Sequence, residues 1–225
     1  MSGPSTCVYC GEPSNTRDHV PPKLLYPKPR PSNLISVPSC ATCNGGFSKD
    51  DEYIRIAVVL RSDLAKHPQA KGLFAPTIRG LNRPQQRGFA QTIVSTGKHV
   101  PVHTTEGSLV GHAPAMIVDL ERLRRTVERI VRGLYFHTFG QRFTATLRVW
   151  AEEDIGGFDQ VLRDELRTNI LIPLYQTPQL SIGEDVFAYW KARDAEHPEA
   201  SAWLLQFFGE VRFLALTGPA NEDAL

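Results

Sequence analysis

Apolar residues recur at helical spacing most clearly between residues 119 and 137. Such a stripe predicts an amphipathic helix that buries one face against a core. Asp119 is suited to cap the N-terminus of this helix, and Gly140, just beyond its end, is suited to terminate it. The residues of the stripe are Leu120, Leu123, Val127, Ile130, Val131 and Leu134.

Shorter patterns predict the other elements. Residues 51–67 and 160–174 have helical spacing, and His67-Pro68 is expected to stop the first of these helices. Residues 69–115 are mixed and predict irregular hairpin structure. The strand-like runs of the chain are residues 17–20, 34–37, 92–95, 99–103, 143–152, 187–193 and 203–217, the last with a turn at Gly209-Glu210.

Together these elements predict an α+β fold. Residues 1–68 are expected to form an N-terminal module that ends with its following helix. Residues 69–219 are expected to form a mixed α+β domain of unclear topology, with a basic helix near 119–138, and residues 220–225 a loose tail. The aromatic side chains of the C-terminal strands are expected in the core rather than in base-stacking positions. They are Phe187, Tyr189, Trp190, Trp203, Phe207, Phe208 and Phe213.

Composition and charge narrow the class of protein. With 41% hydrophobic and 22% charged residues, the chain is typical of a soluble globular protein. It has no apolar run of the roughly 18 residues that a membrane span needs, and no signal peptide, so we expect a cytoplasmic location. Residues 1–142 hold 19 Lys and Arg against 10 Asp and Glu, whereas residues 143–225 hold 6 against 14. The basic front part suits a polyanionic partner, although a drift of surface charge without function is the alternative.

The four cysteines form two C-x-x-C pairs, Cys7 with Cys10 and Cys40 with Cys43. Two such pairs offer four thiolates to one ion, which is the donor set of a structural zinc. Disulfides are disfavoured in a reducing compartment, and a redox site would need one pair rather than two. The sequence therefore predicts one structural zinc ion per chain, with the 29 residues between the pairs folded beside it.

The segment that the cysteines enclose carries a specific set of polar residues. Asp18-His19 ends the first predicted strand, Asn33-Leu34 precedes the second, and Asn44 follows the second C-x-x-C pair. Together with the paired cysteines, this pattern resembles the HNH endonucleases of the ββα-metal type, in their HNN variant. The resemblance covers about a quarter of the chain and implies a ββα-metal module within residues 1–68.

Phosphodiester hydrolysis needs an activated water and stabilisation of the developing charge. His19 can take a proton from water because imidazole titrates near neutral pH. The resemblance implies that Asp18 and Asn44 bind a catalytic metal, that His19 is the general base, and that Asn33 orients His19 or braces the loop. Such oxygen ligands favour magnesium or manganese. Each residue also has a structural alternative: a turn for Asp18 and Asn33, a zinc ligand or surface residue for His19, and a helix cap for Asn44.

Basic residues near this segment are candidates for phosphate contacts. They are Lys23, Lys28, Arg30 and Lys49 in the N-terminal module, and Arg124 and Arg125 on the 119–137 helix, beside Arg122, Arg129 and Arg132. The arginine-rich face of this helix suits a nucleic-acid backbone. The alternative is a solvated face held by Glu121–Arg125 and Glu128–Arg132 pairs, whose members are four residues apart.

The sequence thus predicts a metal-dependent endonuclease that hydrolyses phosphodiester bonds of DNA. RNA as a substrate and a homodimer as the assembly stay open, and no membrane partner is expected. The alternatives are a non-catalytic zinc-dependent nucleic-acid-binding module and an interaction domain with a decayed nuclease site. The joint presence of Asp18, His19 and Asn44 favours the nuclease, because binding alone requires none of them.

Overall fold

The computed structural model of the protein describes residues 5–61, 63–95, 97–104 and 106–218. Helices and strands alternate irregularly along these residues, which confirms the α+β class. The tail expected at residues 220–225 lies outside them. Within the described part of the chain, no helix combines the length and apolarity needed to cross a membrane.

A small antiparallel hairpin and two helices form the N-terminal unit. The two predicted strands are confirmed to within two residues, and Asp18 pairs with Val37 across the hairpin. The helix predicted at residues 51–67 begins earlier than expected. A break after Gly45-Gly46 separates it from a shorter helix, and glycine, which has no side chain, permits the change of backbone conformation there. The elements are β1 (Thr16–His19), the 3-10 helix η1 (Lys23–Leu25), β2 (Ser36–Ser39), α1 (Ala41–Gly46) and α2 (Ser48–Val59).

The expectation that His67-Pro68 ends a helix was wrong. α2 ends at Val59, and His67 instead caps the N-terminus of a new helix, where its Nδ1 accepts from the Ala70 N–H at 3.4 Å. Proline is favoured at the first position of a helix because its missing N–H would have no partner there. Helix also replaces most of the irregular hairpin structure expected for residues 69–95, including the strand expected at residues 92–95. The elements are α3 (Pro68–Leu81), the 3-10 helix η2 (Pro84–Gln86) and α4 (Arg87–Ser95).

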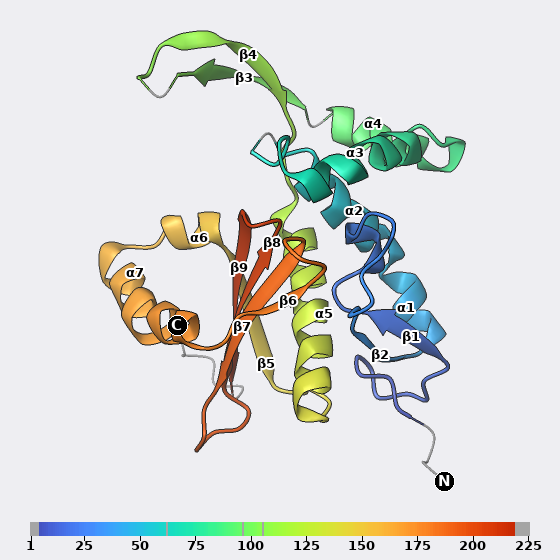
Figure 1. The fold of residues 1–225 in the computed structure, drawn as a ribbon, viewed down its shortest axis with the longest axis vertical. Coiled ribbons are helices and arrows are strands. Elements are labelled where there is room, and N and C mark those ends of the chain that lie inside the picture. Colours follow the sequence, from blue (N-terminus) through green and yellow to red (C-terminus); the bar gives the residue numbers. More distant parts are fainter. Residues whose placement is uncertain (1–4, 62, 96, 105, 219–225) are drawn as a thin grey trace.

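A two-stranded ribbon projects from the body of the molecule (Figure 1). It consists of β3 (Lys98–His103) and β4 (Leu109–Ala115), and it confirms the strand predicted at residues 99–103. The side chains of β3 are exposed along its whole length. The ribbon therefore contributes little to the hydrophobic core.

α5 (Leu120–Phe139) confirms the strongest sequence prediction. The Asp119 carboxylate accepts from the Arg122 N–H at 3.1 Å, and Gly140 ends the helix in a left-handed conformation with φ of 66°. Figure 1 shows α5 between the N-terminal hairpin and the C-terminal sheet. Gly133 allows the close approach, because a Cβ there would lie 2.5 Å from Cγ1 of Val20.

The C-terminal sheet has five antiparallel strands in the order β5-β9-β8-β7-β6. α5 covers one face, while Leu166 and Leu174 pack with Trp190 against the other. The predicted helical segment 160–174, the strands and the turn at Gly209 are confirmed. The elements are β5 (Thr146–Ala151), α6 (Glu152–Gly156), α7 (Gln160–Leu166), the π-helix η3 (Arg167–Leu171), α8 (Ile172–Gln176), β6 (Leu180–Ile182), β7 (Phe187–Arg193), β8 (Ser201–Phe207) and β9 (Val211–Gly218).

One hydrophobic cluster runs through the two predicted units. It joins Val20 and Val37 of the N-terminal unit, Ile130 of α5 and Trp203 of the sheet. All seven aromatic residues that we expected in the core are buried. The cysteine-bearing unit therefore rests on the same core as the C-terminal sheet, so burial as well as metal can hold it in place.

Candidate metal centre and active site

The four cysteine sulfurs lie within 4.8 Å of one another. Cys7 and Cys10 flank the turn before β1, while Cys40 caps α1 and Cys43 lies inside it. The Cys10 and Cys40 sulfurs are 3.7 Å apart. Zinc–sulfur bonds of about 2.3 Å in a tetrahedron require sulfur–sulfur distances of about 3.8 Å. The four cysteines are therefore close enough to hold one zinc ion, as the sequence predicted.

Asn44 connects helix α1 to the strand that carries Asp18 and His19. Its Nδ2 donates to the Arg17 carbonyl and to the Thr16 hydroxyl, both at 3.2 Å. Thr16 and Asp18 project from the same face of β1 because strand side chains alternate. Asn44 therefore contacts the face of β1 that Asp18 uses, with its carbonyl oxygen left to serve as an acceptor.

His19 projects from the other face of β1 and is partly exposed. Burial lowers the pKa of the imidazole, and the positive charges of Lys23 and Arg30 lower it further, against an opposing effect of Asp18. An imidazole with a lowered pKa is neutral at pH 7 and can accept a proton. Its surroundings are cationic, which suits an anionic group beside it.

Asp18 lies in a buried cluster with residues that the sequence patterns did not indicate. Its Oδ2 accepts from the Tyr9 hydroxyl at 2.6 Å and lies 3.7 Å from Nε of Arg129. Arg129 also donates to Asp51 and stacks over the Phe47 ring, with 4.5 Å between the guanidinium carbon and the ring centroid. Burial raises the pKa of Asp51 to about 6, against the opposing effect of Arg129.

The donor set beside Asn44 fits a divalent cation in its chemistry. Asp18 and Asn44 offer one carboxylate and one amide oxygen, the hard ligands that magnesium and manganese accept with several waters. Two carboxylates, Asp18 and Asp51, face one guanidinium, Arg129, so the ionised cluster has one excess negative charge. That excess charge suits a cation, although Oδ2 of Asp18 already has two partners.

Asn33 lies at the junction with the C-terminal sheet. Its Nδ2 donates to the Ser181 carbonyl of β6 at 3.1 Å. No contact with His19 is seen for it in the described part of the chain. Of the two roles that the resemblance implied for Asn33, this contact matches bracing of the loop.

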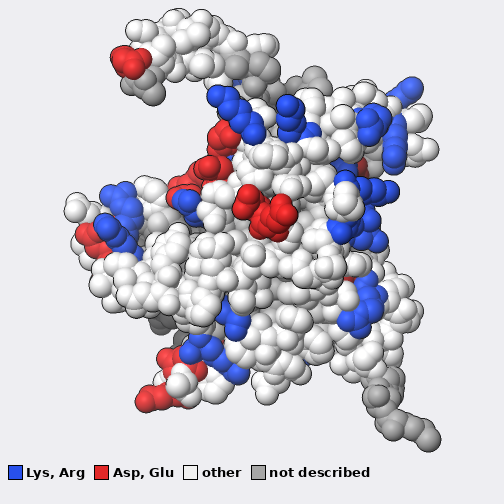
Figure 2. Space-filling model, in the orientation of Figure 1, with Lys and Arg blue, Asp and Glu red and all other residues white. Residues whose placement is uncertain are grey.

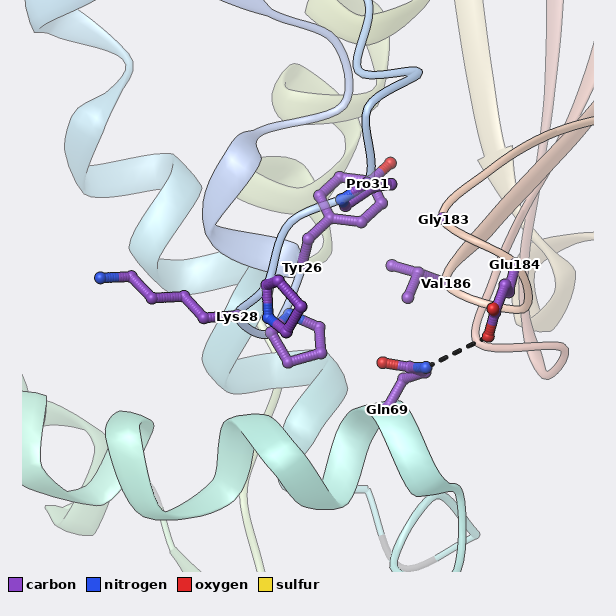
Figure 3. Close-up of a pocket in the computed structure, with 9 residues that line it drawn as sticks. Tyr26, Lys28, Pro31, Gln69, Gly183, Glu184 and Val186 are labelled. Atoms are coloured by element: carbon purple, nitrogen blue, oxygen red, sulfur yellow. Dashed lines mark hydrogen bonds between the residues drawn. The ribbon is translucent and has the colours of Figure 1, made fainter.

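The loop after η1 packs against α3 and the turn before β7. Tyr26, Pro27 and Lys28 line a cavity of about 270 Å³ there, opposite Gln69 and Val186. Figure 3 shows the side chain of Lys28 directed away from this cavity. The predicted phosphate contacts Lys23, Lys28, Arg30 and Lys49 are all exposed.

The arginines of α5 mostly have partners within the protein. Arg124 contacts Glu121 and donates to Asp154 at 2.8 Å, in place of the pairing of Glu121 with Arg125 that the spacing suggested. Arg125 is 58% exposed and lies 3.8 Å from Asp50. Arg129 is 3% exposed, so its inclusion in a nucleic-acid-facing surface was wrong. Nucleic-acid contact by Arg124 and Arg125 stays a prediction.

Tyr9 and Tyr26 offer a matched test of the Asp18 cluster. Burial and the Asp18 carboxylate raise the pKa of Tyr9, so its hydroxyl stays protonated and donates. Tyr9→Phe removes a hydrogen bond to a charged group and should lower the free energy of unfolding by about 1.5–3 kcal/mol in urea denaturation. The Tyr26 hydroxyl is buried without a partner among the described residues, so Tyr26→Phe should leave stability unchanged or raise it. Equal effects of the two substitutions would contradict the importance of the Tyr9–Asp18 bond.

The chain matches no protein-family model, no curated protein and no solved structure. The site is therefore interpreted from its own residues.

Proposed function

We propose that the protein is a metal-dependent endonuclease that hydrolyses phosphodiester bonds of DNA. The cysteines hold a structural zinc ion, His19 is the general base, and Asp18 and Asn44 are the ligands of a magnesium or manganese ion. Asn33 braces the loop between β1 and β2. The resemblance to HNH endonucleases of the HNN type motivates this assignment.

The observation that carries the proposal is the contact of Asn44 with β1. The Asn44 amide reaches the Arg17 carbonyl, one residue before Asp18. This contact joins the helix that carries Cys43 to the strand that carries Asp18 and His19. Three of the four residues that the resemblance marks as functional, Asp18, His19 and Asn44, thus come from one strand and one short helix, with the cysteine cluster beside them.

The chain's own residues have distinct tasks in this reaction. His19 takes a proton from the attacking water, whose oxygen forms the new bond to phosphorus as the bond to the leaving oxygen breaks. Lys23 and Arg30 attract the phosphate to the side of the imidazole. A divalent ion held by Asp18 and Asn44 supplies charge neutralisation at the phosphate. The leaving oxygen then takes its proton from solvent.

A second candidate is a non-catalytic, zinc-dependent nucleic-acid-binding protein. The observation that favours it is the position of Asp18, whose Oδ2 already interacts with Tyr9 and Arg129. A carboxylate in such a cluster can be purely structural. The two candidates differ in metal-dependent cleavage.

Supercoiled plasmid DNA tests the proposal. Protein loaded with zinc is expected to nick or linearise the plasmid when magnesium or manganese is added, and to leave it intact without them. Gel electrophoresis measures the products. An intact plasmid with both metals, together with DNA binding, would reject the nuclease and favour the second candidate.

A further inference from the structure

Several Lys and Arg residues outside α5 have no carboxylate partner among the described residues. Residues 64–105 contain six Lys and Arg and no Asp or Glu. Most of this segment forms α3, η2, α4 and β3. Lys71, Arg79, Arg83 and Arg87 are all exposed, and none forms an ion pair with another described residue. This segment therefore keeps its positive charge, whereas Arg122, Arg124 and Arg129 of α5 have acidic partners.

The helical repeat places Lys71 and Arg79 on one side of α3. Its buried residues are Ala70, Leu73, Thr77 and Gly80. At 3.6 residues per turn, Lys71 and Arg79 both fall on the opposite face. Arg83 is the N-cap of η2 and Arg87 begins α4, so both follow beyond the C-terminal end of α3. Near this end Arg55 is paired with Glu52 at 3.4 Å, so Arg83 and Arg87 are the cations of this end that have no acidic partner among the described residues.

This surface continues from the candidate active site. Lys23 follows His19 by four residues, and Arg30 donates to the Lys23 carbonyl at 3.2 Å. The same loop then meets α3, where a Cβ at Gly72 would lie 3.4 Å from Pro27. The exposed Lys28 follows Pro27 in this loop, and its side chain points away from the cavity (Figure 3). Figure 2 shows Lys and Arg side chains over the region in which Figure 1 places α3 and α4.

We propose that the backbone of duplex DNA lies along this basic track, which runs from the loop at Lys28 across Lys71 and Arg79 to Arg83 and Arg87. This proposal rests on the proposed function, because the track begins beside the same active site and leads duplex DNA away from it. α3 alone is about 20 Å long, a length that spans about six phosphates of one DNA strand. A linear series of unpaired cations suits a regularly spaced polyanion better than a compact acidic protein surface. Because the series continues from the side of His19, the polyanion is the DNA that the proposed active site cuts.

Salt dependence of binding tests the track. Binding of a short fluorescein-labelled duplex is measured by anisotropy at several salt concentrations, without magnesium or manganese. Lys71→Gln/Arg79→Gln and Arg83→Gln/Arg87→Gln should each reduce the slope of log K against log salt by about 2, because each phosphate contact contributes about 0.9. The matched control is Arg163→Gln/Arg167→Gln on the opposite side of the sheet, which should leave the slope unchanged.

An unchanged slope in both track variants, or the same loss of slope in the control, would overturn the track. Weak binding by the unmodified protein with no salt dependence would overturn it as well. Hydrolysis of bis(para-nitrophenyl) phosphate, which is too small to reach α3, separates the track from the chemistry. The track variants should lose duplex cleavage but keep this hydrolysis. Salt-dependent duplex binding without any hydrolysis by the unmodified protein would reject the nuclease and leave the track standing.

Discussion

Replacing Cys43 by serine is expected to strip the protein of zinc and to open the β1–β2 hairpin. The four sulfurs lie together, so loss of one ligand removes the closed coordination that structural zinc prefers. Structural zinc contributes about 10–16 kcal/mol of apparent binding free energy in small zinc modules. Elemental analysis should show about one zinc per unmodified chain and far less in the variant. Hydrogen exchange at residues 16–19 and 36–39 should become much faster.

Thr42→Ala is the matched control, because Thr42 is exposed in the same helix between Cys40 and Cys43. It should keep its zinc and its slow exchange. The hydrophobic cluster around α5 should keep the C-terminal sheet folded in the cysteine variant, since Trp203 and Ile130 remain buried together. Full zinc content in Cys43→Ser, or its absence from the unmodified protein, would contradict the zinc site.

Arg129→Met is expected to destabilise the protein by about 3–5 kcal/mol. Arg129 is 3% exposed and interacts with Asp18 and Asp51, whose side chains are 6% and 16% exposed. Methionine fills similar volume but leaves two buried carboxylates without a cation, which is the costly way to break a buried ion pair. Urea denaturation of the zinc-loaded protein measures the loss.

Arg125→Met is the control for this substitution. Arg125 lies on the same helix, but it is 58% exposed and its contact with Asp50 is 3.8 Å long. Exposed pairs of this kind contribute about 0–1 kcal/mol. Similar losses in the two variants would show that helix α5, rather than the buried cluster, determines the effect.

Local patterns predicted the elements whose burial is strong and regular. The stripe from Leu120 to Leu134 predicted α5 because it buries one consistent face, and the apolar run that begins at Trp203 predicted β8, which is buried on both faces. The C-x-x-C pairs predicted the cysteine cluster, since a shared ion needs only those residue types at that spacing. These signals are contained in short stretches of chain.

Structural features that depend on residues far apart in the sequence could not be predicted from such local patterns. His67-Pro68 is compatible with either end of a helix, and tertiary packing decides between them. Arg129 looked like its exposed neighbours Arg124 and Arg125, yet it points at Asp18, more than one hundred residues away in the sequence. The only local indication was its position two residues after the apolar Val127 and next to Ile130, within the buried stripe.

The role of Asp18 shows the same limit at the candidate site. The motif Asp18-His19 drew attention to the two residues together, but strand alternation directs them to opposite faces of β1. Tyr9 and Arg129, which surround the Asp18 carboxylate, form no local motif with it. The geometry thus adds a buried charge cluster behind the strand that carries the proposed base.

The most direct test of the proposed nuclease is the single-turnover rate of plasmid cleavage by His19→Ala. With zinc content and thermal stability matched to the unmodified protein, the rate should fall by about 10²–10⁴, the usual contribution of a general base. His137→Ala, which removes an exposed histidine at the end of α5, should keep the full rate. An unchanged cleavage rate in His19→Ala would contradict the assignment of His19 as the base.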